Sequence, residues 1–207
     1  MKTKKITSLI LALVMLLSLC ACGSQSAAPA AAEAPAAEAP AESELPAAEP
    51  EEITITDMIG REVTVTPGSY KRVVCIGAGA LRMYSYIGDV SLLCGVEDID
   101  NTTLDERPKM FDSVARPYVL AFGGTFSALP SCGVGGPNAQ AAEAEKILSC
   151  NPDIVISEYE DVDKENALQE QLGVPVVTLK AGPNGVFDDA FKNTMTMLGA
   201  IFCNEEK

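Results

Sequence analysis

The stretch from residue 144 to residue 157 constrains the fold of this chain more than any other part of the sequence. A short helical turn is followed there by Asn-Pro-Asp and then by an apolar run. Pro152 cannot continue a helix, and it disfavours helical geometry at Asn151. Residues 154–156 (Ile-Val-Ile) are β-branched without alternation, which is typical of a strand buried on both faces. The stretch therefore predicts a helix leading into a parallel sheet that is covered by helices.

The same arrangement recurs along the chain. Further strands are expected at 73–76, 92–96, 132–134 and 175–179. Helices are expected at about 80–87, 104–111, 139–149, 161–172 and 187–203. Residues 53–57 and 62–65 alternate like the two strands of a hairpin. The predicted fold class is α/β: a parallel-sheet lobe with flanking helices, an N-terminal β-hairpin and a long C-terminal helix.

The amino terminus has the features of an export signal. Three lysines precede an apolar run over 6–19, which at roughly 14 residues is short for a bilayer span but suits a signal peptide. The run ends in Leu-Cys-Ala-Cys-Gly-Ser, which is similar to a bacterial lipobox. We expect 1–21 to be a lipoprotein signal peptide and Cys22 to carry acyl chains such as palmitate. Lipidation at Cys20, after the bulky Leu19, and ordinary secretion are the alternatives.

The next segment, 22–52, is composed almost entirely of Ala, Pro, Glu and Ser. Such a composition cannot bury enough apolar surface to order itself, so we expect a disordered tether. The formal net charge is −14, and it becomes about −17 once the three signal lysines are removed. This charge argues against a nucleic-acid partner and against binding to anionic lipid.

The residue types that support most enzyme chemistry are scarce. The chain has no histidine, and the five cysteines beyond the signal region form no CxxC pair. A zinc site and a histidine-based triad are therefore not expected. Cys75 and Cys94 lie within predicted apolar strands, where a thiol is usually a small buried hydrophobe. We expect no catalytic residue, no metal cluster and no enzyme activity.

Four motifs occur in a characteristic order. They are Asp-Met-Ile-Gly-Arg-Glu-Val-Thr-Val at 57–65, Arg-Val-Val-Cys-Ile at 72–76, Glu-Lys-Ile-Leu at 145–148 and Asn-Pro-Asp-Ile-Val-Ile at 151–156. Together they resemble the substrate-binding lipoproteins of iron-siderophore, haem and cobalamin ABC importers, which have the class III periplasmic-binding-protein fold. The resemblance implies a protein without a cofactor, anchored by lipid at the extracytoplasmic face of the bacterial cell membrane. It would present a small metal chelate, namely a ferric siderophore, haem or a corrinoid, to an importer permease.

The family pattern has two α/β lobes joined by a long helix, with the ligand held between them. The resemblance implies an N-terminal lobe at 53–185 and the start of the connecting helix at 186–207, so that the protein is truncated before its second lobe. A lone lobe that serves as a surface interaction or scavenging module, or a non-functional gene fragment, is the alternative interpretation.

Ligands of parallel sheets usually bind beyond the carboxyl ends of the strands. Gly77, Ala78 and Gly79 follow one strand, where backbone amides and a helix N-terminus suit an anionic group. A dinucleotide loop is disfavoured, because Arg82 occupies the third glycine position of GxGxxG. Arg82 either pairs with a ligand carboxylate or phosphate or forms a surface ion pair.

Further candidates lie at the same predicted edge of the sheet. Tyr84, Tyr86 and Tyr159 are candidates for contact with a ligand or for oxygen ligation of ferric iron, and for Tyr86 a place in the core is the favoured alternative. Gly136 lies in a turn, and Asn138 beside it either contacts the ligand or caps the next helix. The resemblance further implies that Glu145 docks onto arginines of the permease.

Overall fold

The computed structural model describes residues 51–136, 139 and 141–204. The expected signal peptide, the expected lipidation site Cys22 and nearly all of the expected tether lie outside the described residues, as does Asn138. The described residues all belong to one compact unit, Ala47–Lys207. Regular structure in this unit begins at Ile53.

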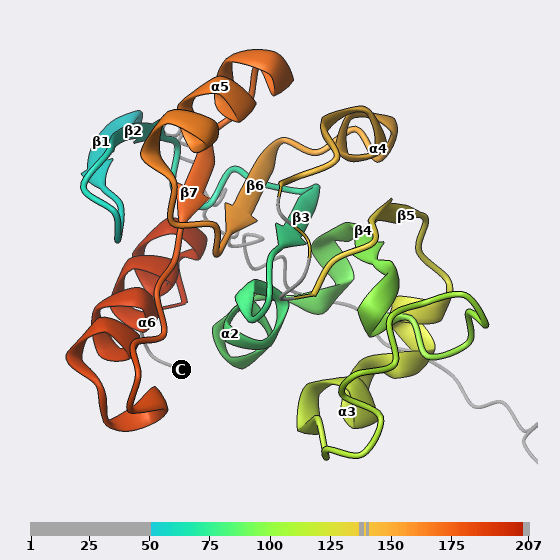
Figure 1. Cartoon of the computed structure of the whole chain (residues 1–207). Coiled ribbons are helices and arrows are strands. Elements are labelled where there is room, and N and C mark those ends of the chain that lie inside the picture. The colour runs from blue at the N-terminus through green and yellow to red at the C-terminus, as the bar shows by residue number, and fades with distance from the viewer. Residues whose placement is uncertain (1–50, 137–138, 140, 205–207) are drawn as a thin grey trace, which may run out of the picture. The chain divides into compact units, whose positions relative to one another are not determined.

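A five-stranded parallel sheet forms the centre of this unit, with the strand order β5-β4-β3-β6-β7 (Figure 1). The strands are β3 (Val73–Ile76), β4 (Leu93–Glu97), β5 (Ser131–Gly133), β6 (Ile154–Ser157) and β7 (Val176–Thr178). β3 and β6 pair in one unbroken register, and every residue of both strands is buried. The prediction of a strand buried on both faces is therefore confirmed.

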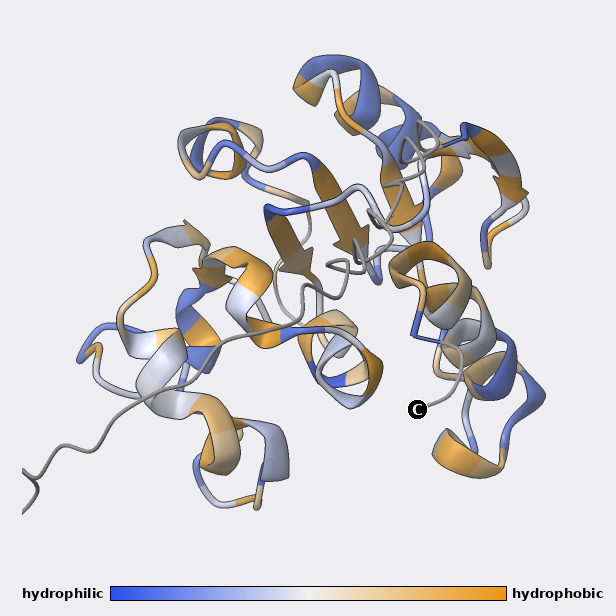
Figure 2. Ribbon diagram, turned by 180° about the vertical axis from the view of Figure 1, so that it is seen from behind, coloured by the Kyte–Doolittle hydropathy of each residue, from blue (hydrophilic) through white to orange (hydrophobic). Residues whose placement is uncertain are grey.

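Helices cover both faces of the sheet (Figure 1). On one face lie α2 (Ala80–Ile87), α3 (Pro117–Ser127) and α6 (Asp189–Phe202), and on the other lie α4 (Ala144–Ser149) and α5 (Val162–Leu172). Short 3-10 turns are η1 (Val90–Leu92), η2 (Asp98–Asp100) and η3 (Gly185–Phe187). Each face has its own cluster of buried apolar side chains, and the strands between them are strongly hydrophobic (Figure 2). The α/β fold class is confirmed.

The expected hairpin is also present, formed by β1 (Ile53–Thr56) and β2 (Glu62–Val65). Its turn is fixed by Asp57, whose Oδ1 accepts a hydrogen bond from the Arg61 amide at 2.9 Å. The Arg61 guanidinium lies 3.2 Å from Asp57 Oδ2 and also donates to the Val176 carbonyl. Because Met58 N donates to Thr178 O at 3.0 Å, the hairpin is fastened to the edge strand β7.

The Asn-Pro-Asp triplet before β6 forms a clamp at the amino end of the sheet. Asp153 accepts hydrogen bonds from the backbone amides of Lys71 and Arg72, at 2.7 and 3.0 Å. The Arg72 side chain in turn donates to the carbonyls of Asn151 and Cys150, each at 2.6 Å. Asn151 has a positive φ of 50°, which reverses the chain between α4 and β6. We call this set of contacts the Asn-Pro-Asp clamp.

The C-terminal helix α6 packs against α2 within the main core. Leu198 and Ile201 are 0% and 1% exposed, so the second half of the helix also packs in the main core. Its last residue, Phe202, makes an edge contact with Tyr84 at a ring-centroid distance of 5.1 Å. The helix ends at Cys203, which has a left-handed conformation, and Asn204 Nδ2 donates to the Ile87 carbonyl at 3.2 Å. The helix is thus shorter than the expected 187–203 and belongs to the body of the lobe.

The region before β5 differs from the prediction. Segment 104–111, expected as a short helix, forms turns instead. The sequence does not predict α3, because Pro117 and the Gly123-Gly124 pair resemble helix breakers. Pro117 is nevertheless at the start of the helix, where its missing N–H costs no hydrogen bond.

The helix expected at 139–149 starts later, at Ala144. Glu143 stands immediately before it, and its Oε1 accepts a hydrogen bond from the Val134 amide at 2.7 Å, which ties this part of the chain to the loop after β5. Among the described residues, none of the helices is both long enough and apolar enough to cross a bilayer.

Candidate functional site

The loops that follow β3, β4, β5 and β6 meet at the carboxyl edge of the sheet. We call this edge the rim and define it as residues 77–79, 98–100, 134–136 and 158–160. All four strands are parallel, so four separate segments of the chain converge at the rim. The sequence places the Gly77, Gly136 and Tyr159 candidates here, and the structure does so as well.

The loop after β3 is held by two acidic side chains. Gly77 has a φ of +92°, and its amide donates to Glu97 Oε1 at 3.1 Å. A Cβ added to Gly79 would lie 2.5 Å from Glu158 Oε2. Glycine is therefore favoured at the first position for its conformation, whereas a side chain at the second would have to displace the end of the Glu158 side chain. The Gly77 amide already has an acceptor, so the loop offers a ligand fewer free donors than we expected.

Glu97 is a buried carboxyl at the end of β4. It is 5% exposed. Burial raises its pKa to about 8, the hydrogen bond from Gly77 lowers it, and the charges of Asp100, Glu143 and Asp98 raise it further. A Cβ on Gly135, where φ is +71°, would lie 2.5 Å from Glu97 Oε2. Glu97 thus packs between the loops after β3 and β5, and at neutral pH it is largely in the uncharged form.

A second buried acid, Asp100, is paired across the rim. Arg116 Nη1 donates to Asp100 Oδ1 at 2.6 Å and to the Ile99 carbonyl at 3.1 Å. The Tyr118 hydroxyl donates to the same Asp100 oxygen at 2.8 Å. Burial raises the pKa of Asp100, whereas these two partners lower it. These hydrogen bonds of Arg116 and Tyr118 fix the start of α3 to the loop after β4. The sequence does not predict them.

A narrow hollow lies between these groups. It is lined by residues of three of the rim loops and of the helix ends, including Gly77, Gly79, Arg82, Asp100, Arg116 and Gly136. Arg82 is half-buried, and its positive charge lowers the pKa of Glu158, which burial raises. Arg82 is therefore close enough to Glu158 to influence its charge.

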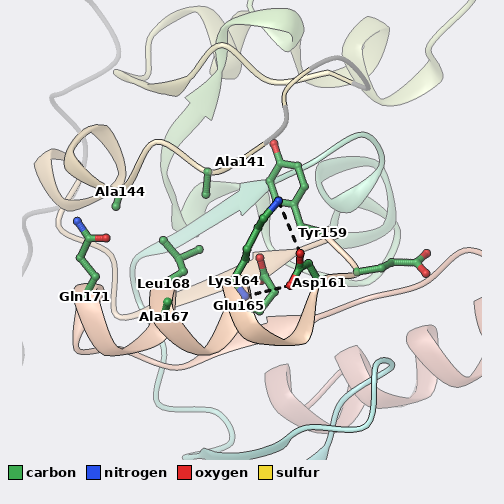
Figure 3. Close-up of a pocket in the computed structure, with 11 residues that line it drawn as sticks. Ala141, Ala144, Tyr159, Asp161, Lys164, Glu165, Ala167, Leu168 and Gln171 are labelled. Atoms are coloured by element: carbon green, nitrogen blue, oxygen red, sulfur yellow. Dashed lines mark hydrogen bonds and ion pairs between the residues drawn. The ribbon is translucent and has the colours of Figure 1, made fainter.

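A larger hollow, of about 270 Å³, adjoins the rim beside Tyr159 (Figure 3). The side chains of Lys164, Glu165 and Leu168 on α5 form one wall, and Ala141 and Ala144 form the opposite one. The Lys164 amide donates to Asp161 Oδ1 at 3.2 Å, which caps α5. Burial raises the pKa of Tyr159, and so do the charges of Glu97 and Glu165. The hollow combines a tyrosine and a lysine with an apolar wall.

The remaining site predictions have mixed outcomes. Tyr84 is wrong as a rim residue, because it is 0% exposed and its hydroxyl donates to the Asp89 carbonyl at 2.9 Å within the main core. Tyr86 is wrong as a core residue, since 47% of it is exposed. Ala78 is exposed on the rim, and Glu145 is exposed on α4. The described residues contain no group of three or more His, Cys, Asp or Glu side chains that could hold a metal ion.

Comparison with known proteins gave matches among solved structures alone. No protein-family model matches the chain, and no curated protein does. The molybdate-binding protein MolA of Haemophilus influenzae, solved with molybdate, is 17% identical with a TM-score of 0.53; the match covers 74% of this chain and 47% of that one. The petrobactin-binding protein YclQ of Bacillus subtilis is 18% identical with a TM-score of 0.53, and the match covers 75% and 47%.

A third structure, the catecholate-siderophore binding protein VctP of Vibrio cholerae, is 20% identical with a TM-score of 0.50. The match covers 75% of this chain and 47% of that chain. This chain thus spans about half the length of the structures it matches. At this level of identity the likeness shows a shared fold.

Proposed function

We propose that this chain, whose described part has the class III periplasmic-binding-protein fold, is the N-terminal lobe of a solute-binding lipoprotein. The protein would serve an ABC importer for iron complexes, either siderophores or haem, or for cobalamin. The observation that carries the proposal is the rim, where four strand ends converge in a fold that is shared with a catecholate-siderophore binding protein and a petrobactin-binding protein.

The location outside the cytoplasm is supported by the sequence. The export signal at 1–21 and the lipobox at Cys22 would leave the mature protein anchored by acyl chains. The tether at 22–52 would hold the lobe at 53–185 away from the membrane surface. Helix α6 packs in the body of this lobe, and the chain would continue from it toward a second lobe, which is the part of such a protein that supplies the other wall of the cleft.

The rim would supply one wall of that cleft. Arg82 would bring positive charge to this wall, and so would Lys164, whose Nζ lies 3.6 Å from Asp161 Oδ2. Positive charge suits the anionic groups of a metal chelate. Tyr159 would provide an aromatic face or a phenol oxygen beside the larger hollow. Gly77, Ala78, Gly79, Gly136 and Asn138 would shape the surface against which the ligand packs. Glu145, exposed on α4, would pair with arginines of the permease.

Titration of the full chain in detergent tests the proposal. The chain has five tyrosines and no tryptophan, so quenching of tyrosine fluorescence reports binding. The ligands are a ferric tricatecholate siderophore, haem and cyanocobalamin, each compared with the metal-free compound where one exists. We expect saturable binding of one class, weaker than for a complete two-lobed cleft.

A charge variant with a matched control sharpens the test. Because a charge-assisted hydrogen bond contributes about 1.5–3 kcal/mol, Arg82→Gln should weaken binding roughly tenfold or more. Lys192→Gln removes one positive charge from an exposed position on α6 and should leave binding unchanged. If none of the three ligand classes shows saturable quenching or a thermal shift, the proposed ligand class is wrong.

A further inference from the structure

Three cysteines gather on the face of the sheet that α4 and α5 cover. Cys94 on β4, Cys132 on β5 and Cys150 at the end of α4 belong to one buried cluster. All three are free thiols in this structure, and each is less than 10% exposed. They come from three separate segments of the chain, so the fold alone brings them together.

Gly95 marks the closest approach within this cluster. A Cβ added to Gly95 would lie 2.5 Å from Cys150 Sγ, 3.1 Å from Cys150 Cβ and 3.2 Å from Cys132 Cβ. Because both Cβ atoms lie this close to one point, the Cβ atoms of Cys132 and Cys150 are at most about 6 Å apart. The Cβ atoms of a disulfide are usually about 3.5–4.5 Å apart, so a movement of at most about 2 Å brings this pair to bonding distance.

The hydrogen bonds of the thiols indicate which two cysteines face each other. Cys150 Sγ lies 3.4 Å from the Lys146 carbonyl oxygen on its own helix and 3.8 Å from that of Ser131, the residue directly before Cys132 on β5. Cys94 Sγ lies 3.5 Å from the Val73 carbonyl on β3, at the other side of β4. Cys150 is thus placed over the boundary between β4 and β5, whereas the Cys94 thiol is directed toward β3.

We propose that Cys132 and Cys150 form a disulfide bond that joins β5 to the end of α4. The proposal takes its oxidising setting from the extracytoplasmic location argued above, where disulfides form and persist. The bond would close the segment 132–150, which contains the Gly135-Gly136 turn of the rim and Glu143. It would thereby restrain one side of the candidate site.

The oxidant is a disulfide, either of glutathione or of a thiol-disulfide oxidoreductase. One cysteine thiolate attacks this disulfide and forms a mixed disulfide, releasing one thiol of the oxidant. The second thiolate then attacks the sulfur of the first cysteine, the Cys132–Cys150 bond forms, and the second oxidant thiol leaves. The two cysteines give up two electrons and two protons, and the oxidant is reduced to two thiols.

The reaction belongs to folding rather than to the folded protein. Burial raises the pKa of both Cys132 and Cys150, so the attacking thiolate is scarce once α4 has packed. We therefore expect rapid formation when the reduced chain refolds in a glutathione redox buffer and slow formation when the folded, reduced chain is placed in the same buffer.

Peptide mapping identifies the bond directly. Trypsin places each cysteine of the described part in its own peptide, because the Arg-Pro bonds at 107 and 116 resist cleavage. These peptides are 73–82, 83–109, 110–146, 147–164 and 193–207. The full chain is refolded in reduced and oxidised glutathione, its free thiols are blocked with N-ethylmaleimide, and the digest is read by mass spectrometry. We expect 110–146 linked to 147–164, and the link should be absent after reduction.

Two variants and a stability measurement complete the test. Cys203→Ala changes an exposed thiol and should leave the link intact, whereas Cys132→Ala/Cys150→Ala should abolish it. Oxidation should raise the thermal midpoint of the unaltered chain by roughly 5–10 °C and leave that of the double variant unchanged. A link from 147–164 to 83–109, or complete blocking of the five thiols in these peptides after refolding, would overturn the proposal. The assay needs neither export nor ligand, so its failure is distinct from failure of the proposed function.

Discussion

Glu97→Gln should make the protein more stable at neutral and alkaline pH. The carboxyl of Glu97 is buried and accepts a hydrogen bond from Gly77, and its pKa is about 8 in the folded state against an ordinary value of 4.5. Below pH 4.5 the group is protonated in both the folded and the unfolded chain. Ionisation of Glu97 then contributes little to the difference in stability between the wild type and Glu97→Gln. As the pH rises, the unfolded chain releases its proton first, so the wild-type protein loses stability until the pH passes 8.

The size of the effect follows from the difference between the two pKa values. Each pKa unit corresponds to about 1.4 kcal/mol, so the wild-type protein should lose roughly 3 kcal/mol between pH 4.5 and pH 7, and roughly 5 kcal/mol by pH 9. Glutamine has nearly the same shape, keeps an oxygen to accept from Gly77 and cannot ionise. The free energy of unfolding of Glu97→Gln should therefore exceed that of the wild type by a margin that grows with pH and levels off above pH 8.

Urea denaturation of both proteins, followed by far-ultraviolet circular dichroism at pH values from 4.5 to 9, measures this margin. Other buried acids, such as Asp100 and Glu165, are present in both proteins, so most of their contribution cancels in the difference. Glu170→Gln, at an exposed position on α5, serves as the matched control and should show no such trend. A margin for Glu97→Gln that stays constant with pH to within about 1 kcal/mol would refute the reasoning.

Three further substitutions test the packing and the helix ends, each by urea denaturation. Gly95→Ala should destabilise the protein by about 1–3 kcal/mol, because the new methyl group would lie 2.5 Å from Cys150 Sγ. Leu198→Ala should cost about 2–5 kcal/mol, since this α6 side chain is fully buried in the main core. Asp161→Ala should cost about 1 kcal/mol, because it removes the acceptor for the Lys164 amide at the start of α5.

Each of these substitutions has a matched control. Gly124→Ala adds a methyl group that meets no atom within 4 Å, and Leu120→Ala changes a side chain that is 81% exposed. Asp163→Ala removes an exposed carboxylate from the first turn of α5 without removing its cap. If a control costs as much as its partner, the contact named for that partner is not the cause of its effect.

The strands and the hairpin could be predicted from sequence because their signals are local. The run at 154–156 and the equivalent run at 73–76 are apolar without alternation, and both form fully buried strands. α2 begins and ends where the sequence predicts, between Gly79 and Gly88. In these segments hydrophobic burial and the flanking glycines favour the same structure.

The missed features depend on contacts between distant residues. Asp100 is 16 residues from Arg116 and 18 from Tyr118, so no local sequence pattern predicts that these three side chains form a cluster. α3 tolerates its glycines because Phe126 packs in the core, a tertiary contact that outweighs intrinsic propensity. Tyr84 lies in the core and not on the rim. Its hydroxyl can be buried there because it donates a hydrogen bond to the Asp89 carbonyl.

The Asn-Pro-Asp clamp and the rim lie at opposite ends of the same strands. The clamp joins β3 to β6 through short hydrogen bonds of Asp153 and Arg72, whereas the rim is made of turns that project beyond the last paired residues. Changes in rim turns away from the buried acids therefore leave the alignment of the central strands intact. A scaffold built in this way allows single rim loops to be exchanged while the folding of the lobe is conserved.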